Sequence, residues 1–369
     1  MSGHDGAPRF IAFVSRSAEC EALLARYPDV RFAFASHTAF APDVVAFDPR
    51  DPSSLFEHFR AAHADAPFAG MLNRREKFVI PAVALAQRLG LRSIARDGAL
   101  LRDKLLMRRA LDGRSDAAFL VRSVDDASKV PASIFPAVLK PRFGFNSRAV
   151  VRARDATELA RAFREHHAHY RALKRPDGAA DDFIVERYLE GREHTVEALV
   201  IDGEIVLSIV SDKAPMHRSC FVETGDVMPS QAPRATQETV LAATRDAVRA
   251  LGFDNGWAHV EVMEHRGSAA VVEVAARMGG GYHEELIDAV YELDRMRLLI
   301  DLHLGPLTLP PLVPRAVVVG RRVVTSGVTF VRPLRSIAAL VERRGARLVF
   351  PSDDRQISRV VVGPPYGYK

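Results

Sequence analysis

A predicted β-hairpin between residues 257 and 281 constrains the fold more than any other segment. It reads WAHVEVMEHRGSAAVVEVAARMGGG, in which two alternating runs flank a turn at His265–Ser268. One set of alternate positions is almost wholly apolar and can pack on a core, because successive side chains of a strand face opposite ways. The other set carries polar side chains: His259, Glu261, Glu273 and Arg277.

The length of the turn decides whether the two acids share a face. A turn of three or five residues would place Glu261 opposite Val271 and diagonal to Glu273, about 7–8 Å away, where two carboxylates can converge on a divalent cation. A turn of two residues would put the acids on opposite faces and remove this hypothesis. The alternative is an ordinary half-solvated hairpin with acids on its wet face. The metal hypothesis therefore predicts a turn of odd length.

The composition is that of a globular protein with two or three domains. The chain has 369 residues, of which 48% are hydrophobic and 26% charged. No apolar run approaches the roughly 20 residues of a membrane span, and the N-terminal stretch MSGHDGAPRFIAFVSRS lacks the pattern of an export signal. The two cysteines, Cys20 and Cys220, fit a reducing compartment. We expect a cytoplasmic protein with no membrane partner.

The positive charge does not indicate a nucleic-acid partner. The net charge is +5 and the pI about 9.3, but arginines are spread along the whole chain, without a long basic block interleaved with aromatics. The most basic stretch, RALKRP at 171–176, is predicted to be a solvated loop. Excess positive charge also suits a site for anionic small molecules such as nucleotides.

The hydrophobic pattern predicts an α/β unit followed by a β-rich region. Strands and helices alternate at the start of the chain, which predicts a parallel, doubly wound sheet. The predicted strands are 9–15, 30–36, 43–48 and 68–73, and the predicted helices are 18–27, 53–63, 77–91 and 99–113. From about residue 119 onward strands and hairpins dominate, so a domain boundary is expected near 95–103.

A basic loop and several acids are candidate binding groups in the β-rich region. Lys140 ends a predicted strand and precedes a loop with Gly144, Asn146 and Ser147, whose backbone N–H groups can turn toward phosphate oxygens. This loop is neither a Walker loop nor a GxGxxG motif, so by itself it is weak evidence.

Glu186 and Glu193 lie further along the chain, on two successive predicted strands. A two-residue turn at Asp202–Gly203 would pair Glu193 with Asp212 and bring Lys213 alongside it. Taken separately, the two glutamates could equally be solvent-facing acids that flank a loop.

The order of these segments resembles the ATP-grasp superfamily, specifically its carboxylate–amine ligases, which include L-amino-acid ligases that make dipeptides. The resemblance covers about residues 68–305: an RDK helix start, a strand with Lys-Pro and a loop, the segment ERYLEGREHTVE, and a two-glutamate hairpin that ends in R-x-GGG. It implies an N-terminal Rossmann-like parallel α/β domain and then an ATP-grasp fold, in which two α+β subdomains clasp ATP. The implied boundaries are 1–97, 98–185 and 186–305, with a C-terminal β-rich subdomain at 306–369.

The resemblance also implies a nucleotide site. Lys104 and Lys140 correspond to the lysines that hold the ATP phosphates, and loop 143–148 to the small flexible loop that closes over them. Glu186 corresponds to the acid at the adenine amino group, and Glu193 to the partner of the ribose hydroxyls. The hinge that offers backbone hydrogen bonds and an apolar wall corresponds to three residues: Arg187, Tyr188 and Leu189.

The resemblance further implies a reaction centre. Glu261 and Glu273 correspond to the ligands of magnesium, or of manganese in its place. Arg277 corresponds to the arginine that grips a substrate carboxylate or acyl-phosphate oxygen, and Gly279–Gly281 to the tight turn beside it. Lys213 corresponds to a further phosphate lysine. One departure concerns position 275, where Ala275 replaces the asparagine of the usual Glu-x-Asn-x-Arg pattern. A methyl group cannot ligate a cation, so either Glu273 bridges two metals or one metal site is weakened.

The implied activity is ATP-dependent amide-bond formation. A carboxylate attacks the γ-phosphate of ATP to give an acyl phosphate and ADP, and an amine then displaces phosphate. The expected substrates are small carboxylates and amines of the amino-acid type, and a homodimer is compatible with the sequence. The candidate substrate residues are His217, Arg218, Glu223, His259 and Gly280. The alternatives are an ATP-grasp enzyme of another outcome, such as a carboxylase or an acyl-phosphate-forming kinase, and a nucleotide-binding protein without turnover.

Overall fold

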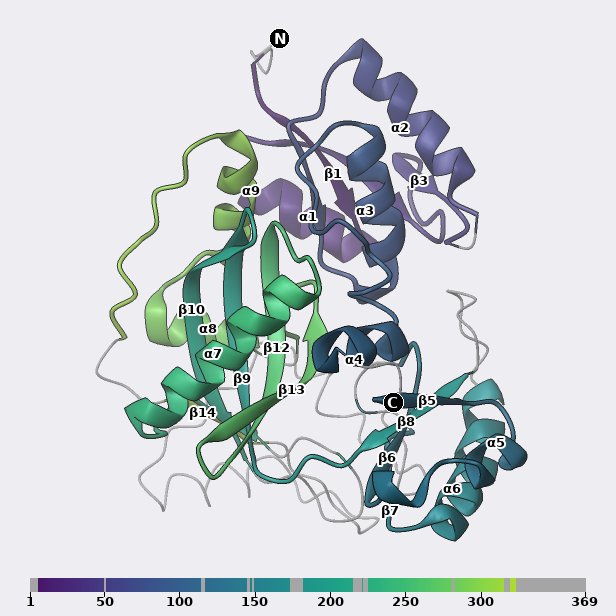
Figure 1. Ribbon diagram of the computed structural model, residues 1–369. Coiled ribbons are helices and arrows are strands. Elements are labelled where there is room, and N and C mark those ends of the chain that lie inside the picture. Colours follow the sequence, from purple (N-terminus) through teal and green to yellow (C-terminus); the bar gives the residue numbers. More distant parts are fainter. Residues whose placement is uncertain are drawn as a thin grey trace, which may run out of the picture.

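The part of the chain that the structure describes contains three β-sheets with helices packed on them (Figure 1). The structure is a computed structural model, and it describes residues 6–49, 51–113, 117–144, 147, 149–172, 182–214, 221, 225–280, 283–314 and 319–322. Each sheet is built from strands that follow one another in the chain. The mixed α/β and α+β architecture predicted from the sequence is confirmed.

The N-terminal sheet is parallel, with the strand order β3-β2-β1-β4. Its strands and helices are β1 (Arg9–Phe13), α1 (Ser17–Arg26), β2 (Arg31–Ser36), β3 (Val44–Ala46), α2 (Ser53–Asp65), β4 (Gly70–Asn73), the 3₁₀ turn η1 (Glu76–Phe78) and α3 (Val79–Arg88). Because β1 is buried on both faces, it reads as an almost continuous apolar run. Its Phe10 packs with α1, while its Ile11 packs with α2 and α3 on the other face.

The small sheet is antiparallel, with the order β5-β8-β6-β7. It follows α4 (Lys104–Asp112), which begins after the N-cap Asp103 and ends at Gly113 in the left-handed region. The elements of the small sheet are β5 (Ala118–Val121), α5 (Val124–Ser128), η2 (Ala132–Ile134), β6 (Ala137–Pro141), β7 (Val151–Ala153), α6 (Ala156–Ala172) and β8 (Phe183–Arg187). Helices α5 and α6 pack on one face of this sheet, around Phe163 and Phe183.

The large sheet has the order β13-β12-β9-β10-β11-β14, and its strands are antiparallel. Its elements are β9 (Arg192–Ile201), β10 (Glu204–Lys213), β11 (Gly225–Met228), α7 (Arg234–Ala250), β12 (Gly256–His265), β13 (Ser268–Ala275), α8 (His283–Tyr291), α9 (Arg295–Leu304) and β14 (Val319–Arg322). Helix α7 covers one face (Figure 1). Helices α8 and α9 pack on the other face, in a core that also includes Phe10 and Phe34 of the N-terminal sheet.

The hairpin β12–β13 has a two-residue turn, so the predicted odd turn is wrong. His265 pairs with Ser268, and the turn residues Arg266 and Gly267 both have positive φ, as a type I′ turn requires. The register then shifts by one residue, because Val262 pairs with Val271 while Glu261 pairs with Glu273. Position 272 is the extra residue of a β-bulge.

This bulge changes the predicted geometry of the acid pair in two ways. Glu261 faces Glu273 directly instead of lying opposite Val271 and diagonal to Glu273. Val271 and Val274 pack in the core with α7, whereas the sequence pattern assigned that face to Val272. A two-residue turn alone would place the two acids on opposite faces of the hairpin. The extra residue of the bulge shifts the register by one, so the acids share a face.

The hairpin β9–β10 repeats this arrangement. The predicted two-residue turn is present, with Asp202 and Gly203 at positive φ, but a register shift between Ile205 and Leu207 follows it. Asp212 therefore pairs with His194 and not, as predicted, with Glu193. The expected proximity of Lys213 and Glu193 is nevertheless found, because Lys213 Nζ lies 2.6 Å from Glu193 Oε1.

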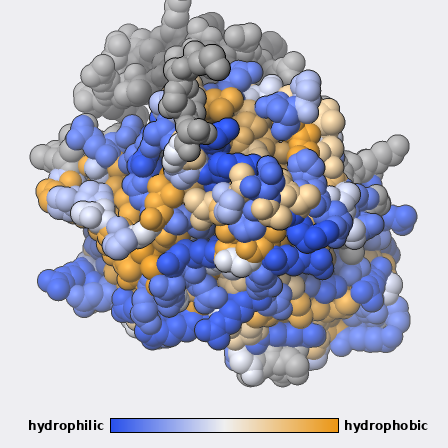
Figure 2. Space-filling view, turned by 90° about the horizontal axis from the view of Figure 1, so that it is seen from above, coloured by the Kyte–Doolittle hydropathy of each residue, from blue (hydrophilic) through white to orange (hydrophobic). Residues whose placement is uncertain are grey.

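Hydrophilic and hydrophobic residues are interspersed on the face seen from above (Figure 2). Among the described residues, no helix combines the length and the apolar character that a membrane crossing requires. The last described strand, β14, belongs to the large sheet through β11. Most of the predicted C-terminal β-rich segment, Cys220 and the loop at 173–176 lie outside the described residues.

Helix α9 joins the large sheet to the N-terminal sheet through His303. An added Cβ on Gly70 of β4 would come within 2.4 Å of His303 Cγ, and the imidazole meets the ring of Phe10 edge-on at 5.7 Å. Burial lowers the pKa of His303 to about 4, because desolvation disfavours the cation. The imidazole is therefore neutral at pH 7 and acts as a packing group between the two units.

Lowering the pH should destabilise the fold through His303. The His303 imidazole takes up a proton near pH 6.5 in the unfolded chain but only near pH 4 in the folded chain. The stability contributed by the neutral imidazole is therefore complete above pH 6.5, and about 2 kcal/mol of it is lost by pH 5. A His303→Gln variant, which cannot titrate, should lose less stability between pH 7 and pH 5 in urea unfolding. Equal losses in the two proteins would contradict this role.

Candidate functional site

The polar face of the large sheet opposes the α7 face and carries most of the predicted site. Strand β9 presents Glu193, Thr195 and Glu197 at alternate positions, and all three are buried. In the register of β12, Thr195 pairs with Glu261 and Glu197 pairs with His259. The residues between them, such as Val196 and Val260, belong to the core with α7. Strand alternation therefore places these acids on a single surface.

Lys213 lies between Glu193, the predicted partner of the ribose, and Glu261, a predicted metal ligand. Its ammonium group is 2.6 Å from Glu193 Oε1 and 2.8 Å from Glu261 Oε1, and the Lys213 side chain is only 2% exposed. Burial opposes ionisation of Glu261, but Lys213 and His259 outweigh it and hold the pKa of Glu261 well below its ordinary value. Glu261 is therefore an anion over the whole physiological pH range.

Glu273 and Arg277 meet cations and acids that come from elements far away in sequence. Lys104, the first residue of α4, forms an ion pair with Glu273. Arg277 Nη2 lies 3.2 Å from Glu76 Oε2, and Glu76 Oε1 lies 3.7 Å from Arg102 Nη1 and 4.0 Å from Lys104 Nζ. Burial by itself would raise the pKa of Glu76. The positive charges of Lys104, Arg277 and Arg102 outweigh burial, so the pKa of Glu76 lies below its ordinary value. Glu76 is thus a buried anion that links the N-terminal unit to the large sheet.

Glu186 on β8 pairs with two buried cations. Lys140 Nζ on β6 lies 2.5 Å from Glu186 Oε1, and Arg108 Nε on α4 lies 3.0 Å from Glu186 Oε2. Burial raises the pKa of Glu186, but Lys140 and Arg108 outweigh that effect and lower it. The structure thus brings together the lysine predicted to hold phosphate and the acid predicted to contact adenine.

The predicted hinge follows Glu186 at the end of β8. Arg187 is exposed and its guanidinium donates to Ser133 O at 2.7 Å, while the Tyr188 backbone N–H donates to Pro136 O at 2.9 Å. The Tyr188 ring carries the Arg152 guanidinium 4.1 Å from its centroid, and Leu189 is half-buried. The Tyr188 N–H is therefore engaged within the protein.

Several predicted residues cannot be placed by the structure. Gly144 is described and buried, and Ser147 is described as an exposed residue with φ of 49°. The others lie outside the described residues: Asn146, His217, Arg218, Glu223 and Gly281. Of the five candidate substrate residues, the structure therefore describes only His259 and Gly280.

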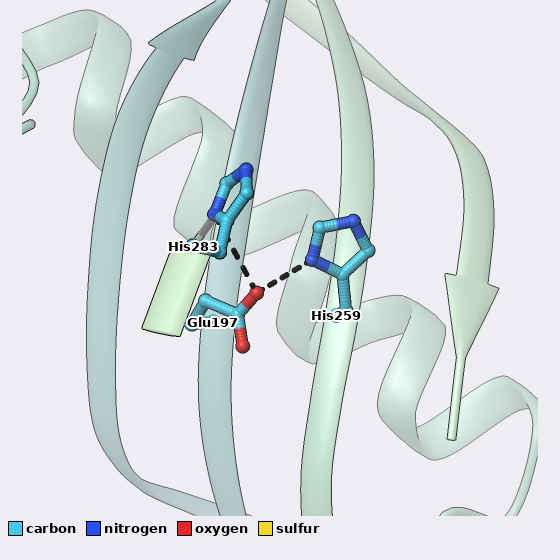
Figure 3. A group of neighbouring side chains, drawn as sticks. All are labelled: Glu197, His259 and His283. Carbon is cyan, nitrogen blue, oxygen red and sulfur yellow. Dashed lines mark hydrogen bonds and ion pairs between the residues drawn. The ribbon is translucent and has the colours of Figure 1, made fainter. Parts of the chain in front are cut away.

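A buried ion-pair network surrounds Glu197 at the centre of the polar face (Figure 3). Glu197 Oε1 accepts a hydrogen bond from His259 Nδ1 at 2.6 Å and lies 3.8 Å from His283 Nδ1. Glu197 Oε2 accepts from Arg295 Nη1 at 2.7 Å and from the Gly279 backbone N–H at 3.1 Å. One carboxylate thus joins β12, the segment after β13 and the starts of α8 and α9.

This network does not have the chemistry of a metal centre. The ligand atoms of Glu197, His259 and His283 lie within 4.8 Å of one another, as in some metal sites. Burial disfavours the His259 cation, but Glu197 outweighs it and raises the pKa of His259 to about 9. A protonated imidazole has no lone pair for a metal, and Arg295 already compensates the charge of Glu197. We interpret the group as a support for the neighbouring turn.

The turn after β13 depends on a glycine at position 279. A Cβ at Gly279 would lie 2.0 Å from Glu197 Oε1 and 2.7 Å from His259 Nδ1, whereas a Cβ at Gly280 would have nothing within 4 Å. The predicted tight turn at Gly279–Gly281 therefore has a specific physical reason at its first residue. The chain must pass directly over a buried carboxylate there.

The carboxylates of Glu261 and Glu273 can hold a divalent cation. They face each other directly across β12 and β13, and hard cations such as magnesium prefer carboxylate oxygens. Each of the two acids offers a lysine-paired oxygen, Oε1, and both side chains keep some exposure, at 24% and 22%. Ala275 pairs with His259 in the register, so the position of the missing third ligand faces the imidazole and not solvent.

The structure adds site residues that the sequence reading missed. Glu76, Arg108 and Glu197 pair with the predicted residues Arg277, Glu186 and His259. Arg102 pairs in turn with Glu76, and Arg295 pairs with Glu197. Two of them had a signal in the sequence. Glu197 continues the alternation of Glu193 and Thr195, and Glu76 follows β4 at the carboxyl edge of the parallel sheet, where ligand sites are common.

Among the described residues, two α+β units follow a parallel α/β unit, and lysines pair with glutamates at the site. Residues 133–285 match the family model for the ATP-grasp domain. This segment of the chain is therefore similar to the ATP-grasp domain.

Two curated relatives with enzymatic names share parts of the chain. Carnosine synthase 1 from Gallus gallus is 30% identical over 191 residues, which are 49% of this chain and 20% of that protein. The alanine–anticapsin ligase of Bacillus subtilis (strain 168) is 26% identical over 248 residues, which are 62% of this chain and 52% of that protein. The chain therefore spans between a fifth and about half of the length of these relatives.

Solved structures share the fold over most of the chain. The L-amino acid ligase from Bacillus licheniformis aligns with a TM-score of 0.69 and 22% identity over 86% of this chain and 81% of that chain. The N5-carboxyaminoimidazole synthetase from Staphylococcus aureus, solved in complex with ADP, aligns with a TM-score of 0.57 and 14% identity over 83% of this chain and 78% of that chain. These likenesses show a shared fold.

Substitution of Gly279 should be far more costly than substitution of Gly280. Gly279→Ala forces the new methyl group into the Glu197 carboxylate and should lower the free energy of unfolding by about 2 kcal/mol or more. Gly280→Ala meets open space and should change it by less than about 0.5 kcal/mol. Urea unfolding of both variants measures the difference. Similar stabilities would show that the turn does not rest on Glu197.

Proposed function

We propose that this protein is an ATP-dependent carboxylate–amine ligase that joins two amino acids through an amide bond and releases ADP and phosphate. One observation carries the proposal: Glu261 and Glu273 face each other directly on the polar face of the large sheet, each paired with a lysine. The names of the relatives support the substrate class, since carnosine synthase, an alanine–anticapsin ligase and an L-amino acid ligase are among them.

ATP would lie between the small and the large sheet. Lys104 and Lys140 would hold its phosphates, Glu186 and the segment Arg187–Leu189 would contact adenine, and Glu193 would bind the ribose. The lysines assigned to the phosphates are paired with the acids of the site. An incoming nucleotide and its metal would exchange these lysine–carboxylate pairs for lysine–phosphate and carboxylate–metal pairs. Every buried charge would then stay compensated, as burial requires.

The residues of the site suit phosphoryl transfer from ATP to a carboxylate. That reaction needs positioning and cationic groups around dispersed negative charge, not a protein nucleophile. Arg277 and Lys213 would stabilise the charge on the transferred group and on the acyl phosphate. Magnesium, or manganese in its place, would be held by Glu261 and Glu273 and would neutralise charge on the phosphates. The buried network around Glu197 would keep the turn at Gly279 and Gly280 in place beside the bound carboxylate.

The domain assignment follows the same proposal. Residues 1–97 would form the Rossmann-like domain, 98–185 the small ATP-grasp subdomain with its connecting helix, 186–305 the large subdomain and 306–369 a C-terminal β-rich subdomain. The small sheet ends with β8 at Arg187 and the large sheet starts with β9 at Arg192, so the change of sheet falls shortly after the proposed middle boundary.

The decisive test is the release of ADP and phosphate in the presence of pooled amino acids. The proposal predicts turnover only when ATP, a divalent cation, a carboxylate and an amine are all present, together with a new amide product in the mass spectrum. Turnover with a carboxylate or bicarbonate alone would indicate a kinase or carboxylase. Nucleotide binding without turnover on any pair would indicate a non-catalytic nucleotide-binding protein.

Removing one acid of the pair should abolish this activity without unfolding the protein. Glu273→Gln keeps the size and hydrogen-bonding capacity of the side chain but removes the charge that a cation needs, so turnover should fall about 100-fold or more. The matched control is Glu57→Gln on α2, an exposed acid that pairs with Arg60. Full activity of Glu273→Gln would disprove its role as a metal ligand.

A further inference from the structure

Helix α4 braces the free edge of the large sheet at the β-bulge that creates the acid pair. Strand β13 is the edge strand, and three residues of α4 on one face of the helix contact it. Lys104 pairs with Glu273, Met107 Sδ accepts from the Val274 backbone N–H at 3.4 Å, and Arg108 reaches the bulge itself. The three residues lie at i, i+3 and i+4 of the helix.

The Arg108 guanidinium binds the irregular backbone of the bulge. Its Nη2 donates to Val271 O at 2.7 Å and to Val272 O at 2.9 Å, the two residues at which the ladder changes register. The other nitrogens are engaged as well, Nε with Glu186 Oε2 at 3.0 Å and Nη1 with Asp112 Oδ1 at 3.3 Å. Arg108 is only 6% exposed and its hydrogen bond to Val271 O is buried, so loss of this donor would leave a buried carbonyl without it.

This geometry has a consequence for the site. Without the bulge, the two-residue turn would place Val272 opposite Glu261 and turn Glu273 toward the apolar face. The group that holds the bulge therefore helps to hold the two carboxylates on one surface. Glu186, which shares Arg108 with the bulge, lies on β8 of the small sheet and in the proposed adenine pocket.

We infer that Arg108 is a positioning residue that fixes the bulge at Val272. By fixing the bulge, it aligns Glu261 and Glu273 for the metal of the bound nucleotide. It also links this alignment to Glu186, the acid on the adenine side. The inference rests on the proposed function in one respect, namely that the ligand of the site is a nucleotide with its divalent metal. Arg108 itself contacts neither reacting group. Its effect reaches the site through the backbone of β13 and through the Glu186 carboxylate.

The first test compares Arg108→Lys with Arg109→Lys, using Mn²⁺ and ADP as probes. A lysine cannot donate to the bulge and to Glu186 at once, so Arg108→Lys should raise the Kd of Mn²⁺ for the ADP-bound protein at least tenfold. The control, Arg109, lies on the same helix but donates to Ala118 O of β5 at 3.3 Å and does not touch β13. Arg109→Lys should change this Kd less than twofold. Mn²⁺ titration by electron paramagnetic resonance gives the Kd, and thermal unfolding shows whether both variants are folded.

The second test deletes the bulge residue. In the ΔVal272 variant the ladder can run regularly from the turn and still place Glu261 opposite Glu273. The acid pair then no longer needs a brace, so Arg108→Lys in this background should raise the Mn²⁺ Kd less than threefold. An equal rise of the Mn²⁺ Kd in both backgrounds would show that Arg108 does not act through the bulge and would overturn the inference. If ΔVal272 fails to fold, the comparison of Arg108→Lys with Arg109→Lys decides.

These measurements separate the inference from the proposed function, because Mn²⁺ and ADP binding needs no turnover. Wild-type protein that binds Mn²⁺ and ADP but forms no amide would remove the ligase proposal and leave the role of Arg108 intact. Wild-type protein that binds neither would overturn both. Equal Kd values for the Arg108→Lys and Arg109→Lys variants would overturn the inference alone.

Discussion

Compensation of buried charge is the constraint on which the site of this protein depends. Glu76 of the N-terminal unit pairs with Arg277 of the large sheet, and Lys104 of α4 pairs with Glu273. Glu186 of the small sheet pairs with Arg108 of α4. Removal of one partner from such a buried pair costs several kcal/mol, since an uncompensated charge is left behind. The units can therefore dock stably only in an arrangement that satisfies all of these pairs together.

Strand alternation gives the large sheet two faces of opposite character. One face packs against α7 through side chains such as Val196 and Val260. The other face carries Glu193, Glu197 and Glu261, whose charges are met by Lys213, Arg295 and the imidazole of His259. Burial of these charges without partners would destabilise the fold. Full exposure of the same charges to water would have no such cost. The proposed nucleotide site rests on the partial burial of this face beside paired cations.

Much of the fold followed from the order of segments in the sequence. Alternating strands and helices at the start predict a parallel sheet, because each apolar strand must be covered on both faces. The positions of Lys140 at a strand end and of Glu186 within a strand were also predicted, since period-two patterns place residues on strands reliably. Charged partners such as Arg108, which pairs with Glu186, and Glu76, which pairs with Arg277, were not predicted. Each lies far from its partner in the chain, and only docking of the units brings the two close.

The sequence by itself determined which residues lie on strands, where the two hairpins turn and which alternate positions are polar. Only the tertiary structure decided the register of those hairpins. Each two-residue turn is followed by a register shift, which pairs Glu261 with Glu273 and His194 with Asp212. A bulge leaves no mark in a local pattern of apolar and polar residues. It forms because groups outside the hairpin, here the guanidinium of Arg108, satisfy the backbone that the irregular ladder exposes.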